Sequence, residues 1–312
     1  MTFSPRAIRK WFLAICATIV LTGSWNSAFA ADITFHRSLS SSGPVALKVC
    51  TNSGTVVVTG AEGNKVEISA KIHNSKWSAF GNTERMKAIA ADPPVIQSGN
   101  VVHVGNQETC GRHLLQNIAI DYVISVPKSS SVVVNSGSGD IHVATIQSFV
   151  RAASGSGSIK ATDIGPASRL ETGSGTVDIQ SAHGDVKAIS GSGDLAIRDS
   201  DVTEARLRAG SGNITAINLQ GGLRANTGSG SLTLSGSPGS DWKIETGTGT
   251  IRCHLNANSK FTLDAETGSG AVHSKLPMPN SGHGTNSELR GPVNGGGPIV
   301  KMSTGSGDIE IE

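Results

Sequence analysis

Residues 169–197 read RLETGSGTVDIQSAHGDVKAISGSGDLAI and contain one full copy of a repeat. A Gly-Ser-Gly or Gly-Thr-Gly tripeptide recurs through the second part of the chain at spacings of 18 to 21 residues, with one wider gap of 37 residues, about two periods, before the last copy. The first glycines of these tripeptides are Gly137, Gly155, Gly173, Gly191, Gly210, Gly228, Gly247, Gly268 and Gly305. A fixed period of this length indicates a structural repeat whose units stack on one another.

Apolar residues alternate with polar ones on both sides of each tripeptide. Val186 and Ala188 precede Gly191, and Leu195 and Ile197 follow it. A period of two is typical of strands that bury one face. The residue immediately before the first glycine is nearly always Ser, Thr or Ala. Each repeat is therefore expected to be a strand, a narrow glycine corner, a second strand and a looser turn, with the small hydroxyl residues stacked at the corner.

The repeat predicts an all-β fold, a parallel β-solenoid of about nine coils of 18–19 residues each, because equivalent residues line up in columns only when strands stack in register. An antiparallel sandwich is the main alternative, and it would not align such columns. Only 4% of the 312 residues are aromatic and 39 are Gly, so the core is expected to be thin and aliphatic. Glycine at the corners is expected to supply positive φ angles.

The first thirty residues have the pattern of a secretory signal peptide. Arg6, Arg9 and Lys10 are followed by an apolar run over residues 11–23, and cleavage is expected between Ala30 and Ala31. The product would be exported, to the periplasm, the cell surface or the medium. It would carry 23 basic and 24 acidic residues, and no later stretch is long and apolar enough to span a membrane.

Residues 31–130 are expected to form an N-terminal cap and the first strands, with an inserted segment, and residues 131–312 the regular solenoid. A short helix is predicted over residues 83–91, because Asp92-Pro93-Pro94 follows and proline disfavours helix at the preceding residue. Residues 275–298 are rich in Gly, Pro and Asn, and they fit either a loop excursion or one degenerate coil.

Three cysteines remain after the signal segment: Cys50, Cys110 and Cys253. In an oxidising compartment we expect Cys50 to pair with Cys110, because both lie before the regular repeats. Cys253 falls at an inward position, where we expect a small core residue and not a reactive thiol.

Several motifs together resemble the bacterial "putative adhesin" domain of unknown function. They are YVISVPK at residues 122–128, VVVNSGSGDI at residues 132–141, the serial Thr-Gly-Ser-Gly rows, and TGSGDI at residues 304–309. The similarity extends over roughly residues 45–312. The resemblance implies an exported or envelope-associated β-solenoid, and it brings no catalytic residues with it.

One outward column is mostly basic, at the position four residues before each corner glycine. Its members, named here the cationic column, are Arg151, Arg169, Lys187, Arg206, Arg224, Lys243 and Lys301. Like charges on adjacent strands are mildly destabilising, so this column needs either neighbouring acids or a bound polyanion. Glu171, Glu245 and Glu266 lie two positions further along the same outward face. A solvated face that discourages sheet aggregation and an anion-binding site both remain open.

The sequence offers no clear catalytic or metal site, so no cofactor is expected. Asp140, Asp194 and Asp308 follow Gly-Ser-Gly corners, as in calcium-binding β-rolls, but the acid does not recur in the other corners, which favours ordinary turn aspartates. The histidines show no zinc-site spacing, the glycine tripeptides lack the phosphate-loop ending, and no acid pair recurs on adjacent rows as glycoside hydrolysis requires.

We therefore predict a non-catalytic, exported, adhesin-like structural or interaction module. The alternative is a receptor for an anionic polymer, such as an acidic polysaccharide, lipopolysaccharide or extracellular nucleic acid, that uses the cationic column. A protein partner is also compatible with the sequence. A polysaccharide-active enzyme on a β-helical scaffold is the third hypothesis, and the lack of an acid cluster counts against it.

Overall fold

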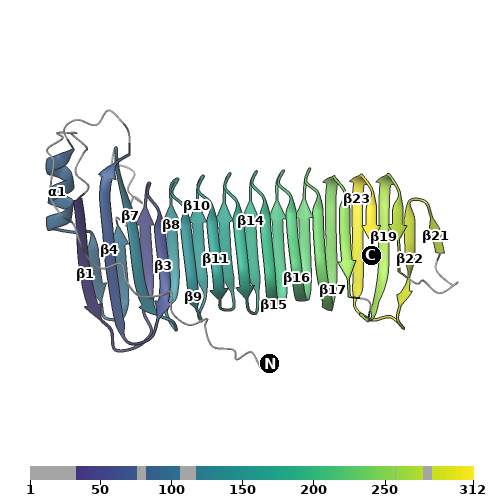
Figure 1. The fold of residues 1–312 in the computed structure, drawn as a ribbon, viewed down its shortest axis with the longest axis horizontal. Helices are drawn as coiled ribbons and strands as arrows, with labels where there is room; N and C mark the ends of the chain where they lie inside the picture. The colour runs from purple at the N-terminus through teal and green to yellow at the C-terminus, as the bar shows by residue number, and fades with distance from the viewer. Residues whose placement is uncertain (1–32, 76–81, 106–116, 257, 277–282) are drawn as a thin grey trace, which may run out of the picture. The chain divides into compact units, whose positions relative to one another are not determined.

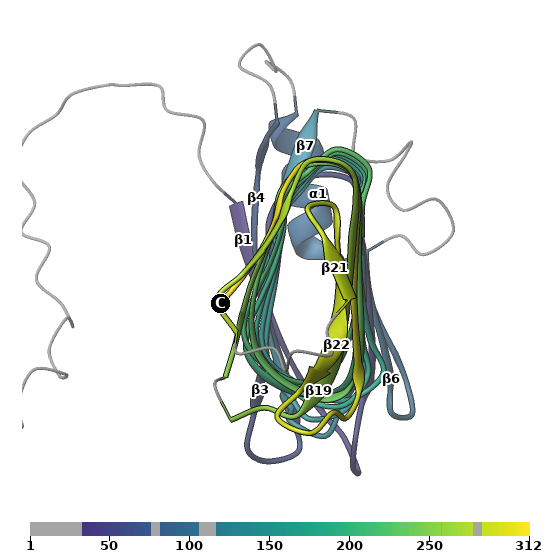
Figure 2. The same cartoon turned by 90° about the vertical axis from the view of Figure 1, so that its right-hand side faces the viewer.

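A computed structural model describes residues 33–75, 82–105, 117–256, 258–276 and 283–312. These residues form an all-β structure in which a mostly parallel sheet curls into a near-closed solenoid. Strands that lead into the glycine corners make one face, called the pre-corner face, and strands that leave the corners make the post-corner face (Figure 1). Viewed along the stack, the successive coils superpose as a flattened loop (Figure 2).

Among the described residues, the pre-corner face contains fourteen strand segments, and three long strands contribute only their second halves to it. In spatial order they are β5 (Val95–Ser98), β6 (Val101–Gly105), β2 (Ala46–Thr51), β8 (Ser131–Ser136), β10 (Val150–Ser154), β12 (Ser168–Thr172), β14 (Val186–Ser190), β15 (Leu195–Ala209), β16 (Ile214–Thr227), β17 (Leu232–Thr248), β23 (Ile299–Ser306), β19 (Phe261–Ser269), β22 (Glu288–Val293) and β21 (His283–Thr285).

The post-corner face is built in the same way and takes the first halves of β15, β16 and β17. In spatial order it contains β1 (Ile33–Ser40), β4 (Lys65–Asn74), β7 (Ile118–Pro127), β3 (Val56–Ala61), β9 (Ile141–Ile146), β11 (Ile159–Ile164), β13 (Val177–Ala182), β15, β16, β17, β18 (Ile251–Leu255), β24 (Ile309–Ile311) and β20 (Val272–Ser274).

The pairings confirm the parallel, in-register stacking and exclude the antiparallel sandwich. Val132 pairs with Val150 on the pre-corner face, and Ile159 pairs with Val177 on the post-corner face. The inward positions predicted from the period of two are buried, except after Gly268, where Val272 is only partly buried, and they form one continuous, mostly aliphatic core. The number of coils, about nine, stays a prediction, because both ends depart from the regular repeat.

The corner glycines are required chiefly by the close approach of neighbouring coils. A Cβ atom on Gly191 would lie 2.3 Å from the carbonyl oxygen of Gly173, and one on Gly193 would lie 2.0 Å from that of Gly175. Neither Gly191 nor Gly193 has a positive φ, in contrast to Gly249 and the later second-position glycines. The expectation that positive φ selects these glycines is therefore wrong for most of the corners.

Hydroxyl side chains form the predicted ladder beneath the corners. Thr172 is buried, and its Oγ1 donates a hydrogen bond to the Gly157 carbonyl of the previous coil (2.8 Å) while accepting one from the Gly175 N–H of its own coil (3.1 Å). Ser154 makes the equivalent two bonds one coil earlier. Each hydroxyl thus satisfies one buried carbonyl and one buried amide, which would otherwise destabilise the corner.

At the C-terminal end, the order of the coils in space differs from their order in the sequence. Strands β23 and β24, which carry the last corner, lie between β17–β18 and β19–β20. The described part of residues 275–298 contains an antiparallel hairpin, β21–β22, that pairs with β19. It is therefore neither a plain loop nor a parallel coil, and the Gly305 row does not lie two periods beyond the Gly268 row.

The N-terminal end has the same kind of inversion. Strands β2 and β3 lie between β8–β9 on one side and the later strands β6–β7 on the other. Helix α1 (Thr83–Ala91) has the predicted bounds and packs against β1 and β4, with Met86 buried in the core. The helix and the antiparallel strands β1, β4 and β5 cover strand edges that would otherwise pair with other chains.

Candidate functional site

The cationic column exists as predicted, as one continuous outward row across neighbouring strands of the pre-corner face. The strand registers place its seven members side by side in the order Arg151, Arg169, Lys187, Arg206, Arg224, Lys243 and Lys301. Adjacent parallel strands are about 4.8 Å apart, so the seven side chains start from an evenly spaced line. The sequence could not show that Lys301 is the direct neighbour of Lys243, because that contact depends on the inserted position of β23.

Five members of the column are paired with carboxylates. Arg169 pairs with Glu171, and Lys243 Nζ lies 2.9 Å from Glu245 Oε1. Lys301 Nζ lies 3.6 Å from an Asp264 carboxylate oxygen and 3.9 Å from one of Glu266. The three acids named from the sequence, Glu171, Glu245 and Glu266, therefore do act as partners.

Glu204 is the partner that the sequence reasoning missed. Its carboxylate receives the guanidinium groups of both Arg206 and Arg224, and its side chain is only 19% exposed. Glu204 lies two residues before Arg206 on the same strand. Because residues two apart in a strand share a face, the alternation of the sequence could have identified Glu204 as an outward neighbour of Arg206. Arg206 and Arg224 are consequently held on a protein carboxylate and are less available to a ligand than their exposure implies.

Two members, Arg151 and Lys187, make no ion pair or hydrogen bond with any residue that the structure describes. Arg208 lies on the same outward face, two residues after Arg206, and it is unpaired within the same described ranges. These three cations are the part of the pre-corner face whose charge is not offset by a neighbouring acid. Beyond the column, Lys48 continues the line past Val133, and Arg290 ends it with ion pairs to Asp264 and Glu288.

The corner aspartates have structural roles. Asp140 Oδ1 accepts a hydrogen bond from the Ser158 N–H (2.8 Å), and Asp194 Oδ1 accepts one from the Asn213 N–H (2.7 Å) in the next coil. Asp308 does the same for Ala271. In the described ranges, no group of three His, Cys, Asp or Glu side chains is placed to hold a metal ion.

The cysteines also have defined environments. Cys253 is free and fully buried, and burial raises the pKa of its thiol to about 12. It is therefore protonated and inaccessible in the folded protein, as expected of a core residue. Cys50 is disulfide-bonded, whereas Cys110 lies outside the described residues, so the Cys50–Cys110 pairing stays a prediction. The cleavage site at Ala30 and Ala31 lies outside the described residues too.

Residues 26–312 match the model of a family described as Toastrack DUF4097. The chain belongs to this family. The residues that match the Toastrack model include every strand of both faces.

Two solved structures are similar to this Toastrack chain. One, described as a "putative cell adhesion protein" from Clostridium sporogenes, is 12% identical, covers 90% of this chain and 99% of its own, and has a TM-score of 0.30. The other, described as a "putative adhesin" from Bacteroides fragilis, is 15% identical, covers 91% of this chain and 98% of its own, and has a TM-score of 0.44. No curated protein matches the chain.

Proposed function

We propose that this Toastrack protein is an exported, non-catalytic, adhesin-like interaction module of the bacterial envelope. The observation that carries the proposal is that polar side chains at the glycine corners are used inside the stack. Corner hydroxyls such as that of Thr172, and the three corner aspartates, bond to backbone groups of a neighbouring coil. What remains for partners is the pair of broad outward faces, and such surfaces suit binding better than chemistry, which needs converging groups in a concave site.

Export rests on residues 1–30, and the expected product begins at Ala31. N-terminal sequencing of the protein recovered from the periplasm or medium tests this directly. Ala28→Arg and Ala30→Arg should block processing, because the cleavage site requires small residues at both positions. A processed product that begins elsewhere, or an unprocessed cytoplasmic protein, would contradict the proposal. Among the described residues, no helix has the length and apolar character to cross a membrane.

The adhesin-like role is tested by attachment. Beads coated with the folded protein should be retained on bacterial envelopes or matrix material, and beads coated with the same protein after thermal unfolding should not. Retention that is equal for both preparations would show that attachment does not depend on the fold, and would sink the proposal. Turnover of an acidic polysaccharide by the purified protein would favour an enzyme instead.

A second candidate function is the binding of an anionic polymer to the pre-corner face. The observation in its favour is that Arg151, Lys187 and Arg208 lie on one outward face without a partner among the described residues, while five other cations nearby are neutralised. Surface cations that contact a polyanion release counterions, so binding weakens as salt increases.

The test compares a double variant, Lys187→Gln with Arg208→Gln, with Glu204→Gln. The first should weaken binding to heparin, lipopolysaccharide or DNA and reduce the salt slope by about one per lost contact. The second should strengthen binding, because it releases Arg206 and Arg224. Glu84→Gln is the matched control, since Glu84 pairs with Lys87 on α1 in the same way (2.9 Å), away from this face. Equal binding by all four proteins would make the column a solvated face.

A further inference from the structure

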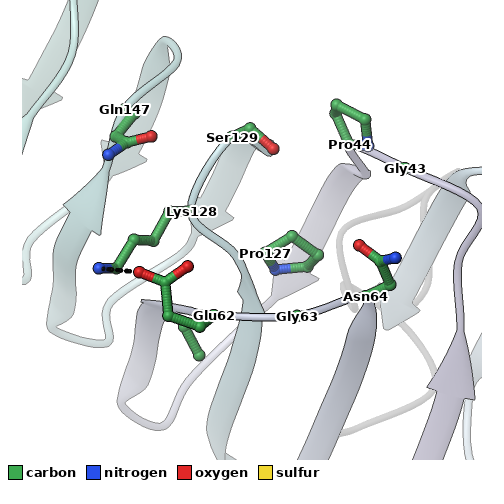
Figure 3. Close-up of a pocket in the computed structure, with 10 residues that line it drawn as sticks. Gly43, Pro44, Glu62, Gly63, Asn64, Pro127, Lys128, Ser129 and Gln147 are labelled. Carbon is green, nitrogen blue, oxygen red and sulfur yellow. Dashed lines mark hydrogen bonds and ion pairs between the residues drawn. The ribbon is translucent and has the colours of Figure 1, made fainter.

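Two adjoining hollows lie at the turns opposite the glycine corners. The first, of about 280 Å³, is lined by the turns at residues 43–44, 61–64 and 127–129, together with Gln147 (Figure 3). The second, of about 390 Å³, is lined by residues 147–149, Ser129, Pro166 and Ala167. Ser129 and Gln147 line both hollows, so the two form one groove that crosses several successive turns. We call it the turn groove.

An exposed aromatic ring forms part of the turn groove. Phe149 is 41% exposed, and the other exposed large apolar side chains in the described structure, those of Ile96, Val123 and Ile299, are aliphatic and lie outside the groove. Pro166 and Ala167 beside it are exposed as well. The amide of Gln147 and the hydroxyls of Ser129 and Ser148 lie next to this apolar surface. An aromatic face flanked by side-chain amides and hydroxyls matches a sugar ring, which has apolar C–H faces and hydroxyl edges.

Two cations border the groove, one at each part of it. Arg151 follows Phe149 by two residues on the same outward face, which places their Cα atoms about 6.6 Å apart, and it has no partner in the described part of the chain. Lys128 lies in the first hollow, where its Nζ is 2.6 Å from Glu62 Oε1 (Figure 3). The Glu62 side chain is 86% exposed, and so well-solvated a pair is weak and readily exchanged for another carboxylate.

Part of the backbone of these turns is already bonded from coil to coil. The Gln147 N–H donates to the Lys128 carbonyl (2.8 Å), and the Gly165 N–H donates to the Ile146 carbonyl (2.7 Å). A peptide strand could therefore not use these two N–H groups for main-chain pairing. The side chains that line the groove, an aromatic ring, an amide, hydroxyls and a lysine, favour a ligand rich in hydroxyl and carboxylate groups.

We propose that the turn groove binds an extended acidic glycan, with Phe149 stacked on one sugar ring and with Arg151 and Lys128 each bound to a uronate carboxylate. Glu62 competes with the glycan for Lys128 and so limits affinity. The proposal rests on the adhesin-like function and names the class of ligand for it. It uses a surface that shares only Arg151 with the cationic column.

The experiment measures binding of three polyuronates, polygalacturonate, alginate and hyaluronate, with methyl-esterified polygalacturonate as the neutral probe. At least one polyuronate should bind, and the methyl ester should bind at least tenfold more weakly than polygalacturonate if that is the ligand bound. Phe149→Ala and Arg151→Gln should each weaken binding at least fivefold. Glu62→Gln should tighten it two- to fivefold. Glu84→Gln, as a matched control on α1 outside the groove, should change it less than twofold.

Three results would overturn the groove proposal, and each points to a different explanation. If none of the three polyuronates binds, the groove is not a glycan site, and the bead-attachment assay then decides separately whether the adhesin-like function survives. If Lys187→Gln abolishes binding while Phe149→Ala does not, the glycan occupies the cationic column instead. If a polyproline peptide binds and Phe149→Ala abolishes that binding, the groove takes protein. Thermal melts of every variant exclude loss of fold as the cause.

Discussion

The carbonyl oxygen of Gly247 lies 2.6 Å from the position that a Cβ atom on Gly305 would occupy. Gly268 is nearer to Gly305 in the sequence than Gly247 is. A Cβ atom on Gly268 would lie against the Gly305 carbonyl oxygen, so the Gly268 coil packs on the other side of the Gly305 coil. The C-terminal strands β23 and β24 are therefore paired on both edges and are not an exposed end. The solenoid ends instead with the short strand β20 and the hairpin β21–β22.

Replacement of Gly305 by Ala should destabilise the protein by about 2 kcal/mol or more, because overpacking against atoms that cannot move typically costs about 1–3 kcal/mol and the obstructing atom is backbone. Urea unfolding measures the loss. Gly43→Ala is the control, since its Cβ would meet only the flexible Asn100 side chain, at 3.7 Å. Equal stability of the two variants would contradict the close-approach account of the corners.

The hydroxyl ladder predicts opposite effects at two positions. Thr172→Val keeps the shape but leaves a buried carbonyl and a buried amide without their partner, so it should cost about 1–3 kcal/mol. Ala209 interrupts the ladder at the equivalent position, so Ala209→Ser should stabilise the protein by about 0.5–1.5 kcal/mol. Thr172→Ser is the control and should retain most of the stability in the same denaturant titration. A destabilised Ala209→Ser would mean that the corner lacks room for the hydroxyl.

The post-corner strands contain, where they approach the turns opposite the corners, a second column that stores strain. Thr145, Asp163, Ser181, Asp199 and Asn218 all have positive φ, between 49° and 58°. A β-branched residue is the least suited of these to the left-handed region, and Asn is among the best suited. Thr145→Asn should therefore raise stability by about 1 kcal/mol, measured by the shift in Tm. Thr162→Asn, at a β11 position without a positive φ, should have no stabilising effect, and a gain there equal to that at Thr145 would refute the argument.

Cys253 predicts a dependence of stability on pH. Its pKa is about 12 in the folded protein and about 8.5 in an unfolded chain. Since the folded pKa is raised, this contribution to stability is complete below about pH 8.5 and falls as pH rises toward 12. Alkylation at pH 8 should be slow for the folded protein and fast in denaturant. The decline in stability between pH 9 and 11 should be smaller in Cys253→Ala. Rapid alkylation of the native protein would contradict full burial.

Much of the candidate site could be predicted because an outward column follows from strand parity and repeat length alone. Arg151 to Lys243 occupy their expected places for that reason. The positions of the cationic column were predicted, but its charge balance was not. Glu204 reaches Arg206 on its own strand and Arg224 on the next strand, and the contact with Arg224 depends on side-chain reach and register. The turn groove was also missed, since Lys128 and Phe149 line adjoining hollows that form only when the turns of different coils stack.

The repeat unit, the parallel columns, the buried positions and the end of α1 before Pro93 all follow from the amino-acid sequence. These features are local or periodic, so composition and spacing specify them. The order of the coils at the two ends, by contrast, depends on tertiary packing. Each glycine corner is chemically almost equivalent to the next, and the repeat therefore carries no information about which coil lies against which. Packing at the ends, with Met86 at one and the β21–β22 hairpin at the other, selects the arrangement in which β2–β3 and β23–β24 lie inside the stack.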